Sequence, residues 1–334
     1  MAIGEAWVFD VETGAEIATI PNVSGKAVRL SPNGSQLAAQ TVEAGVLNGI
    51  AIFDIATGDR VRLMDGMCSW DPDLLAAAAF STDGTIGDCQ DGELGGDATD
   101  LAWSLDGSML AFAGGSSQQF RVWDAASGAV LFTSEKLGTP GFALSALQFS
   151  PDSSELAVSS KTGMWVHDTE TWAEKAMVTH TGRPSWVIRY TPDGSQIVTA
   201  QAHSGSVRVY DTETYGEIDY RPSGAQNRDL GLSSDGLLAA LASKQGTILV
   251  IDLVSGDTLE IIDRVGKDIT NVEFIDDDRH LIITGSTGPI EIVTLEPTEL
   301  VDIGRSRISR PFTPLECETY LIDPCPTLEE IRNG

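Results

Sequence analysis

Four polar side chains stand at the same place in a repeated sequence pattern, two residues before a turn that ends a short apolar stretch. They are Arg29, Gln148, Arg189 and Glu273. Guanidinium, amide and carboxylate groups can hold a charged or hydrogen-bonding ligand. An acid–base site would need several converging carboxylates or a histidine, and this set contains one carboxylate. The residue types therefore favour binding over catalysis.

The other residues that could carry chemistry are scattered along the sequence. The histidines lack the short spacings of metal ligands and lie at His167, His180, His203 and His280. Neither Gly-Lys dipeptide has the upstream glycine and the following Ser or Thr of a phosphate loop. The frequent aspartates stand before turns, where they have a structural task. We expect no cofactor, no metal and no enzymatic activity.

Arg183 and Trp186 precede Arg189 in a connecting segment. An exposed tryptophan beside an arginine is typical of residues that dominate protein interfaces. Trp186 fits a buried core position equally well. We include both residues among the candidate binding residues.

Two series of turns organise the chain with a common period of about 40 residues. The first resembles Ser-Pro-Asp-Gly and recurs at Ser31, Trp70, Ser104, Ser150, Thr191, Ser233 and Ile275. The second is an aspartate followed four residues later by Gly, Trp or Tyr, at Asp10, Asp54, Asp88, Asp124, Asp168, Asp211 and Asp252. Each period holds four short strands with alternating apolar residues. Such a unit buries both faces only by stacking on copies of itself.

The repeats that begin at Leu101 and Phe149 resemble WD40 repeats. The first reads LAWSLDGSMLAFAGG and continues to FRVWDAASG; the second reads FSPDSSELAVSS and continues to GMWVHDTETW. The Trp-Asp pair of the family is complete only at Trp123-Asp124, and its Gly-His pair is absent. The buried hydrogen-bond network of the family is therefore not expected here.

The resemblance implies an all-β fold, a seven-bladed WD40-like β-propeller over residues 1–297 with a short helical C-terminal tail over residues 298–334. The second blade, Met67–Gly95, would be abbreviated. Residues 5–20 read as the last two strands of a blade whose first two are missing. The first strand of each blade would line a central channel, so the four polar side chains would lie near that channel.

The tail carries two helix-start signals, at Thr313–Glu316 and Thr327–Glu330. In each, a threonine precedes a glutamate by three residues, and the two side chains can cap each other's backbone N–H groups. Short helices are marginal in water, so we expect the tail to dock on the propeller where the ring closes. A disulfide between Cys317 and Cys325 would close a small loop; two free thiols are the alternative.

The string RSRISRPFTPLECETYLIDPCP, from Arg305 to Pro326, resembles the tail that closes many actinobacterial WD40 proteins. In those proteins the propeller follows a STAND-type ATPase, an activator region or a kinase. The resemblance implies that this chain is the C-terminal part of a larger bacterial signalling protein.

The charge composition of the chain limits the kinds of partner that it can bind. The formal net charge is −28, with 49 acidic against 21 basic residues, which disfavours nucleic acid and anionic membranes. No apolar run approaches the roughly 20 residues of a membrane span, and no signal peptide is visible, so we expect a cytoplasmic protein.

These features together predict a non-catalytic interaction or sensing module, a scaffold that presents loops to a protein or peptide partner or to upstream domains of the same polypeptide. The alternative is an enzyme or small-ligand binder with a site at the channel mouth.

Overall fold

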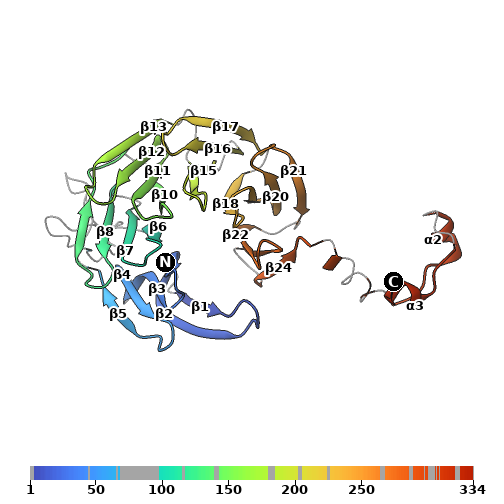
Figure 1. Ribbon diagram of the computed structural model, residues 1–334. Helices are drawn as coiled ribbons and strands as arrows, with labels where there is room; N and C mark the ends of the chain where they lie inside the picture. The colour runs from blue at the N-terminus through green and yellow to red at the C-terminus, as the bar shows by residue number, and fades with distance from the viewer. Residues whose placement is uncertain are drawn as a thin grey trace, which may run out of the picture.

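The computed structural model describes residues 4–43, 46–64, 67, 98–114, 117–138, 143–179, 185–201, 205–223, 226–263, 268–285, 289–296, 298–299, 305, 307, 309–319 and 324–333. Antiparallel sheets follow one another in chain order around a ring (Figure 1). The first has five strands, β1 (Gly4–Phe9), β2 (Glu16–Leu30), β3 (Gln36–Glu43), β4 (Val46–Asp54) and β5 (Arg60–Leu63).

Four sheets of four strands each come next. The second sheet holds β6 (Ala98–Trp103), β7 (Met109–Gly114), β8 (Phe120–Asp124) and β9 (Val130–Thr133); the third holds β10 (Leu144–Phe149), β11 (Glu155–Ser160), β12 (Gly163–Asp168) and β13 (Glu174–Thr179). The fourth holds β14 (Ser185–Tyr190), β15 (Gln196–Gln201), β16 (Ser206–Asp211) and β17 (Glu217–Pro222); the fifth holds β18 (Asn227–Leu232), β19 (Leu238–Ser243), β20 (Thr247–Asp252) and β21 (Thr258–Asp263). The last sheet has three strands, β22 (Ile269–Ile275), β23 (His280–Gly285) and β24 (Glu291–Thr294).

Serine, threonine and aspartate side chains close both kinds of turn. In the first kind, the Ser150 hydroxyl donates to Asp152 Oδ1 at 2.6 Å, and the same oxygen accepts the Ser154 N–H at 3.0 Å. In the second kind, Asp168 Oδ1 accepts the Thr171 N–H at 2.8 Å and its hydroxyl at 2.6 Å. These hydrogen bonds lower the pKa of Asp152 and Asp168. The turns thus use the acceptors that the sequence repeats.

The core lies between neighbouring sheets. Between the first two, Ile52 and Ala27 pack against Leu101 and Trp123, all fully or almost fully buried. Similar apolar layers join the second sheet to the third and so on to the last. Each sheet is therefore buried on both faces except at the two ends of the series.

The prediction of seven blades is wrong: the described residues form six. The predicted second blade, Met67–Gly95, lies outside the described residues except for Met67. The described sheets on either side of this segment are direct neighbours in the ring, because β2 contacts β6 and one apolar layer joins the two sheets. A further sheet would have to displace that layer.

Two sheets depart from four strands. The predicted half-blade at residues 5–20 is the β1–β2 hairpin, in which Trp7 is opposite Thr19 and Phe9 is opposite Glu16. The second half of the long strand β2 pairs with β3 and so joins this hairpin to the first sheet. In Figure 1 the first and last sheets face each other across the open side of the ring.

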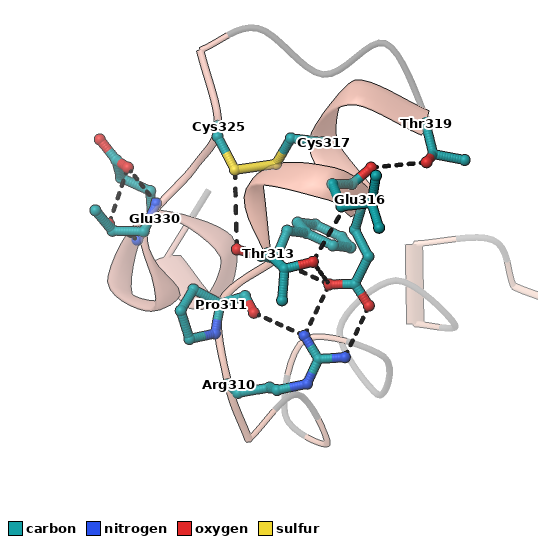
Figure 2. The surroundings of a disulfide bond; sticks show 11 residues. Arg310, Pro311, Thr313, Glu316, Cys317, Thr319, Cys325 and Glu330 are labelled. Atoms are coloured by element: carbon teal, nitrogen blue, oxygen red, sulfur yellow. Dashed lines mark hydrogen bonds and ion pairs between the residues drawn. A yellow bond between two sulfur atoms is a disulfide. The ribbon is translucent and has the colours of Figure 1, made fainter.

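The predicted helix-start signals are confirmed in the tail by α2 (Pro314–Thr319) and α3 (Leu328–Asn333). Thr313 N–H donates to Glu316 Oε2 at 2.7 Å, and Glu316 N–H donates back to the Thr313 hydroxyl at 3.3 Å. Cys317 and Cys325 are joined by a disulfide, with an S–S distance of 2.02 Å (Figure 2). Both helices stand away from the ring in Figure 1, and docking of the tail stays a prediction. None of the helices described is long and apolar enough to cross a membrane.

Candidate binding surface at the channel mouth

The six innermost strands bring one sequence position from each blade to the same end of the channel. These strands are β2, β6, β10, β14, β18 and β22, and each contacts the next in order. The position two residues before the first turn is occupied by Arg29, Ala102, Gln148, Arg189, Gly231 and Glu273. A repeated unit thus places chemically different side chains around one axis.

Arg29, Gln148, Arg189 and Glu273 line one cavity of about 520 Å³ at this end. The structure therefore brings together four of the six candidate binding residues. Arg183 and the side chain of Trp186 lie outside the described residues. Whether the four bind a partner stays a prediction.

Each arginine is held by an aspartate of the next blade. Arg29 Nη2 lies 2.5 Å from Asp100 Oδ1, and Arg189 Nη2 lies 3.1 Å from Asp229 Oδ1. Burial raises the pKa of Asp100, and the charge of Arg29 opposes that rise. Burial alone would lower the pKa of Arg189, but Asp229 and the other nearby carboxylates raise it. We take both pairs to be ionic, because a buried charge needs an opposite charge beside it.

The same aspartates also reach one blade further. Asp100 Oδ2 accepts the Leu147 N–H at 3.2 Å, and Asp229 Oδ2 accepts the Val272 N–H at 3.1 Å. A carboxylate on one inner strand therefore links the strands on either side of it. Sequence reasoning missed both aspartates; the available signal was an aspartate four residues before the first turn in two blades.

Glu273 completes the charged part of the mouth. Its Oε1 lies 3.3 Å from Arg189 Nη2, and its side chain is 51% exposed. Loss of solvation raises the pKa of Glu273, and Arg189 lowers it in part. The backbone at Val272 and Glu273 lies very close to Gly231 on the neighbouring strand β18. A Cβ added at Gly231 would lie 2.7 Å from the Val272 carbonyl oxygen and 3.0 Å from Glu273 Cα. Only glycine fits at position 231 without a shift of the backbone.

Apolar side chains surround the charged centre. The first turns of four blades contribute to the cavity wall, with proline at Pro32, Pro151 and Pro192 and with Leu105 in the second blade. Leu105 is 61% exposed and Leu30 is 50% exposed. Gln148 Oε1 is buried and has no hydrogen-bond partner. The surface thus offers apolar contacts around charges that are already paired.

A second buried polar cluster, which sequence reasoning also missed, joins the third and fourth blades. Glu155 accepts hydrogen bonds from the hydroxyls of Tyr190 at 3.1 Å and Tyr215 at 2.6 Å, and Lys175 Nζ lies 2.5 Å away. Burial and this carboxylate raise the pKa of Tyr215 to about 12. All partners are engaged within the cluster, which is typical of a structural tie.

The described part of the chain contains no set of side chains arranged to bind a metal ion. There, no three His, Cys, Asp or Glu side chains group as metal ligands do. The carboxylates at the mouth already accept hydrogen bonds from arginine and backbone N–H groups.

Comparison with known proteins agrees with the propeller fold. Residues 91–124 match the family model described as "WD domain, G-beta repeat". This stretch is similar to a WD40 repeat. It includes strands β6, β7 and β8 of the second blade and Trp123-Asp124. No curated protein sequence matches the chain.

A solved structure, "Crystal Structure of Mitotic Checkpoint Complex", contains a chain with a similar fold. The TM-score is 0.66 at 12% sequence identity, over 87% of this chain and 81% of that chain. At this identity the likeness concerns the fold alone, a β-propeller.

Proposed function

We propose that this protein is a non-catalytic interaction module that binds a protein or peptide partner at the channel mouth. The observation that carries the proposal is the cavity of about 520 Å³, in which apolar turn residues surround a charged centre. Interfaces commonly combine a desolvated centre with apolar and aromatic anchors.

The charges at the mouth support binding over catalysis. Asp100 and Asp229 each hold an arginine and a backbone N–H, so neither is available as a base or nucleophile. The arginines in turn are fixed by these aspartates and present a rigid surface. A rigid, preformed surface loses little conformational entropy when a partner binds.

Leu105 and Glu273 are the side chains best placed to touch a partner, because both line the cavity and both are more than half exposed. Leu105 offers an apolar anchor. Glu273 offers a carboxylate that a basic or amide side chain can reach. The excess of acidic residues over the whole chain also favours a basic partner.

The test compares proteins captured by the immobilised ring from an extract of its source organism. The mouth variant combines Leu105→Asp with Glu273→Lys. The control, Leu259→Asp, changes a leucine of β21 that is 56% exposed and outside the mouth. We expect a set of proteins that the mouth variant loses by at least about tenfold, as for loss of an interface anchor, and that the control retains. Equal capture by all three proteins would contradict the proposal.

A small ligand is the second candidate, because the cavity volume lies within the range of ligand pockets, about 300–1,000 Å³. Thermal melting with a metabolite library distinguishes the two. A small ligand raises the melting temperature of the wild type and not that of the mouth variant.

We further propose that the ring serves as the sensing part of a larger bacterial signalling protein. The support is the tail sequence from Arg305 to Pro326 with its capped helix and its disulfide. The reading frame upstream of the Met1 codon tests this: an ATPase, activator or kinase domain in frame supports it, and a stop codon directly upstream contradicts it.

A further inference from the structure

A second surface, at the open side of the ring, points to a different partner segment. The first and last sheets enclose a groove of about 780 Å³ there, lined mainly by apolar residues that include Trp7, Phe9, Ile282, Ile290 and Ile292. Four of these side chains are well exposed: Trp7 at 56%, Phe9 at 40%, Ile290 at 47% and Ile292 at 50%. Each wall is the kind of apolar sheet face that is covered at the other junctions of the ring.

The two sheets that form the walls of the groove also end in edge strands. Within the described residues, β1 pairs only with β2, and β24 pairs only with β23. Ala6, Val8 and Ala18 of the β1–β2 hairpin pack against buried residues of β2, β3 and β4, and Ala6 and Val8 also reach the groove. Among the described strands, the hairpin is therefore the outer half of a blade, with part of its surface buried and the outer edge of β1 unpaired. An unpaired edge next to an apolar face is a site for strand addition.

We propose that an extended segment of a partner protein adds to this half-blade and fills the groove. Its apolar side chains would alternate along the strand, as they do in the blades of the ring. The helices α2 and α3 of the tail are not themselves this added strand, because capping boxes and the Cys317–Cys325 disulfide hold them as helices.

Charge indicates the composition of that segment. Residues 4–25 contain four acidic residues, Glu5, Asp10, Glu12 and Glu16, and no Lys or Arg; residues 280–304 contain no Lys or Arg either. A second copy of this chain would bring a net charge of −28 to a groove whose one charged lining residue is Asp10, and like charges repel. The groove fits an apolar strand flanked by Lys or Arg.

The probe is a displayed library of random 12-residue peptides, selected on the full chain and then depleted on a seam variant, Trp7→Asp with Ile292→Asp. Both substitutions are at exposed side chains, and thermal melting checks that the variant folds. We expect enriched peptides with alternate apolar residues and basic flanks. Their affinity should fall at least about tenfold on the seam variant, as for loss of an anchor residue, and stay unchanged on Leu105→Asp, which separates this site from the channel mouth.

A peptide with an N-methyl group at each alternate backbone nitrogen should also lose binding, because strand addition depends on main-chain hydrogen bonds. Three results would overturn the inference. One is a selection that yields no peptide able to distinguish wild type from the seam variant. Another is a stable dimer in sedimentation that the seam substitutions abolish. The third is hydrogen exchange of β1 and β24 as slow as that of β19 in the free chain, since the groove would then be closed.

Discussion

Arg189 on β14 holds Asp229 on β18 at 3.1 Å, and the same relationship joins Arg29 to Asp100 at 2.5 Å three blades earlier. In both cases the aspartate accepts a backbone N–H from the blade that follows. The six blades thus form two triplets with the same link across their inner strands.

Replacement of Asp229 by Ala should lower the free energy of unfolding by about 3 kcal/mol, because Arg189 would keep a buried charge without its main partner. Glu217→Ala is the control, since it removes from Arg208 a carboxylate that is 37% exposed, against 6% for Asp229, and it should cost less. Urea unfolding measures both. An equal effect of the two substitutions would show that the link contributes no more than a surface pair.

Gly231→Ala should destabilise the fold by about 1–3 kcal/mol, as overpacking of a closely packed site does. The added Cβ would lie 2.7 Å from the Val272 carbonyl oxygen. Gly4→Ala serves as the control, because the nearest atom there is an ordinary 3.4 Å away. If the two variants melt at the same temperature, the close approach of β18 and β22 is not a constraint.

Removal of the Glu155 carboxylate should cost about 1.5–3 kcal/mol, the usual effect of losing hydrogen bonds to a charged group. Glu155→Ala leaves the hydroxyls of Tyr190 and Tyr215 without their acceptor. Glu155→Gln keeps an acceptor and should cost less. Chemical denaturation of the two variants measures the difference, and the reverse order would contradict the network.

Low pH should lower the free energy of unfolding, because the aspartates of the turns become protonated. Hydrogen bonds from Thr171 and Thr214 lower the pKa of Asp168 and Asp211 in the folded state. A lowered folded pKa means that these carboxylates stabilise the fold above the ordinary aspartate pKa, about 3.9, and that this contribution is lost as the pH falls through the folded pKa. The double variant Asp168→Asn, Asp211→Asn should show a smaller loss of unfolding free energy between pH 5 and pH 2. A slope equal to that of the wild type would contradict this reading.

Deletion of residues 298–334 should lower the melting temperature by roughly 2–4 °C, the effect of about 1 kcal/mol in a chain of this size. Glu299, the second residue of the tail, accepts hydrogen bonds from His280 at 2.9 Å and from Thr294 at 3.0 Å on the last sheet. Calorimetry of the two chains measures the change. An unchanged melting temperature would show that the tail is a free tether.

The turn series at Ser150 and Asp168 was enough to predict four-stranded units and the inner-strand position of Arg29 and Arg189. The number of blades was not predictable in this way. The turn signals at Trp70 and Asp88 predicted an additional blade between the first two sheets. The period of the turns does not show whether two neighbouring sheets pack directly against each other.

The charged links escaped prediction for a related reason. Asp100 has partners on the blades before and after it, and Glu155 accepts from Tyr190 and Tyr215 of the next blade. Such partners are about 35 to 70 residues away in sequence, so only the closed packing of blades reveals them. Polar residues inside a strand otherwise read as solvent-facing positions.

The central claim is that the channel mouth binds a protein partner, and site-specific photo-crosslinking in the source organism tests it most directly. A photoreactive amino acid replaces Leu105 at the mouth in one chain and Leu259 on β21 in another; both leucines are more than half exposed. Binding at the channel mouth predicts a discrete crosslinked protein from position 105 that is absent from position 259 and is lost when Glu273→Lys is added. The same crosslinks from both positions, or none from position 105, would contradict it.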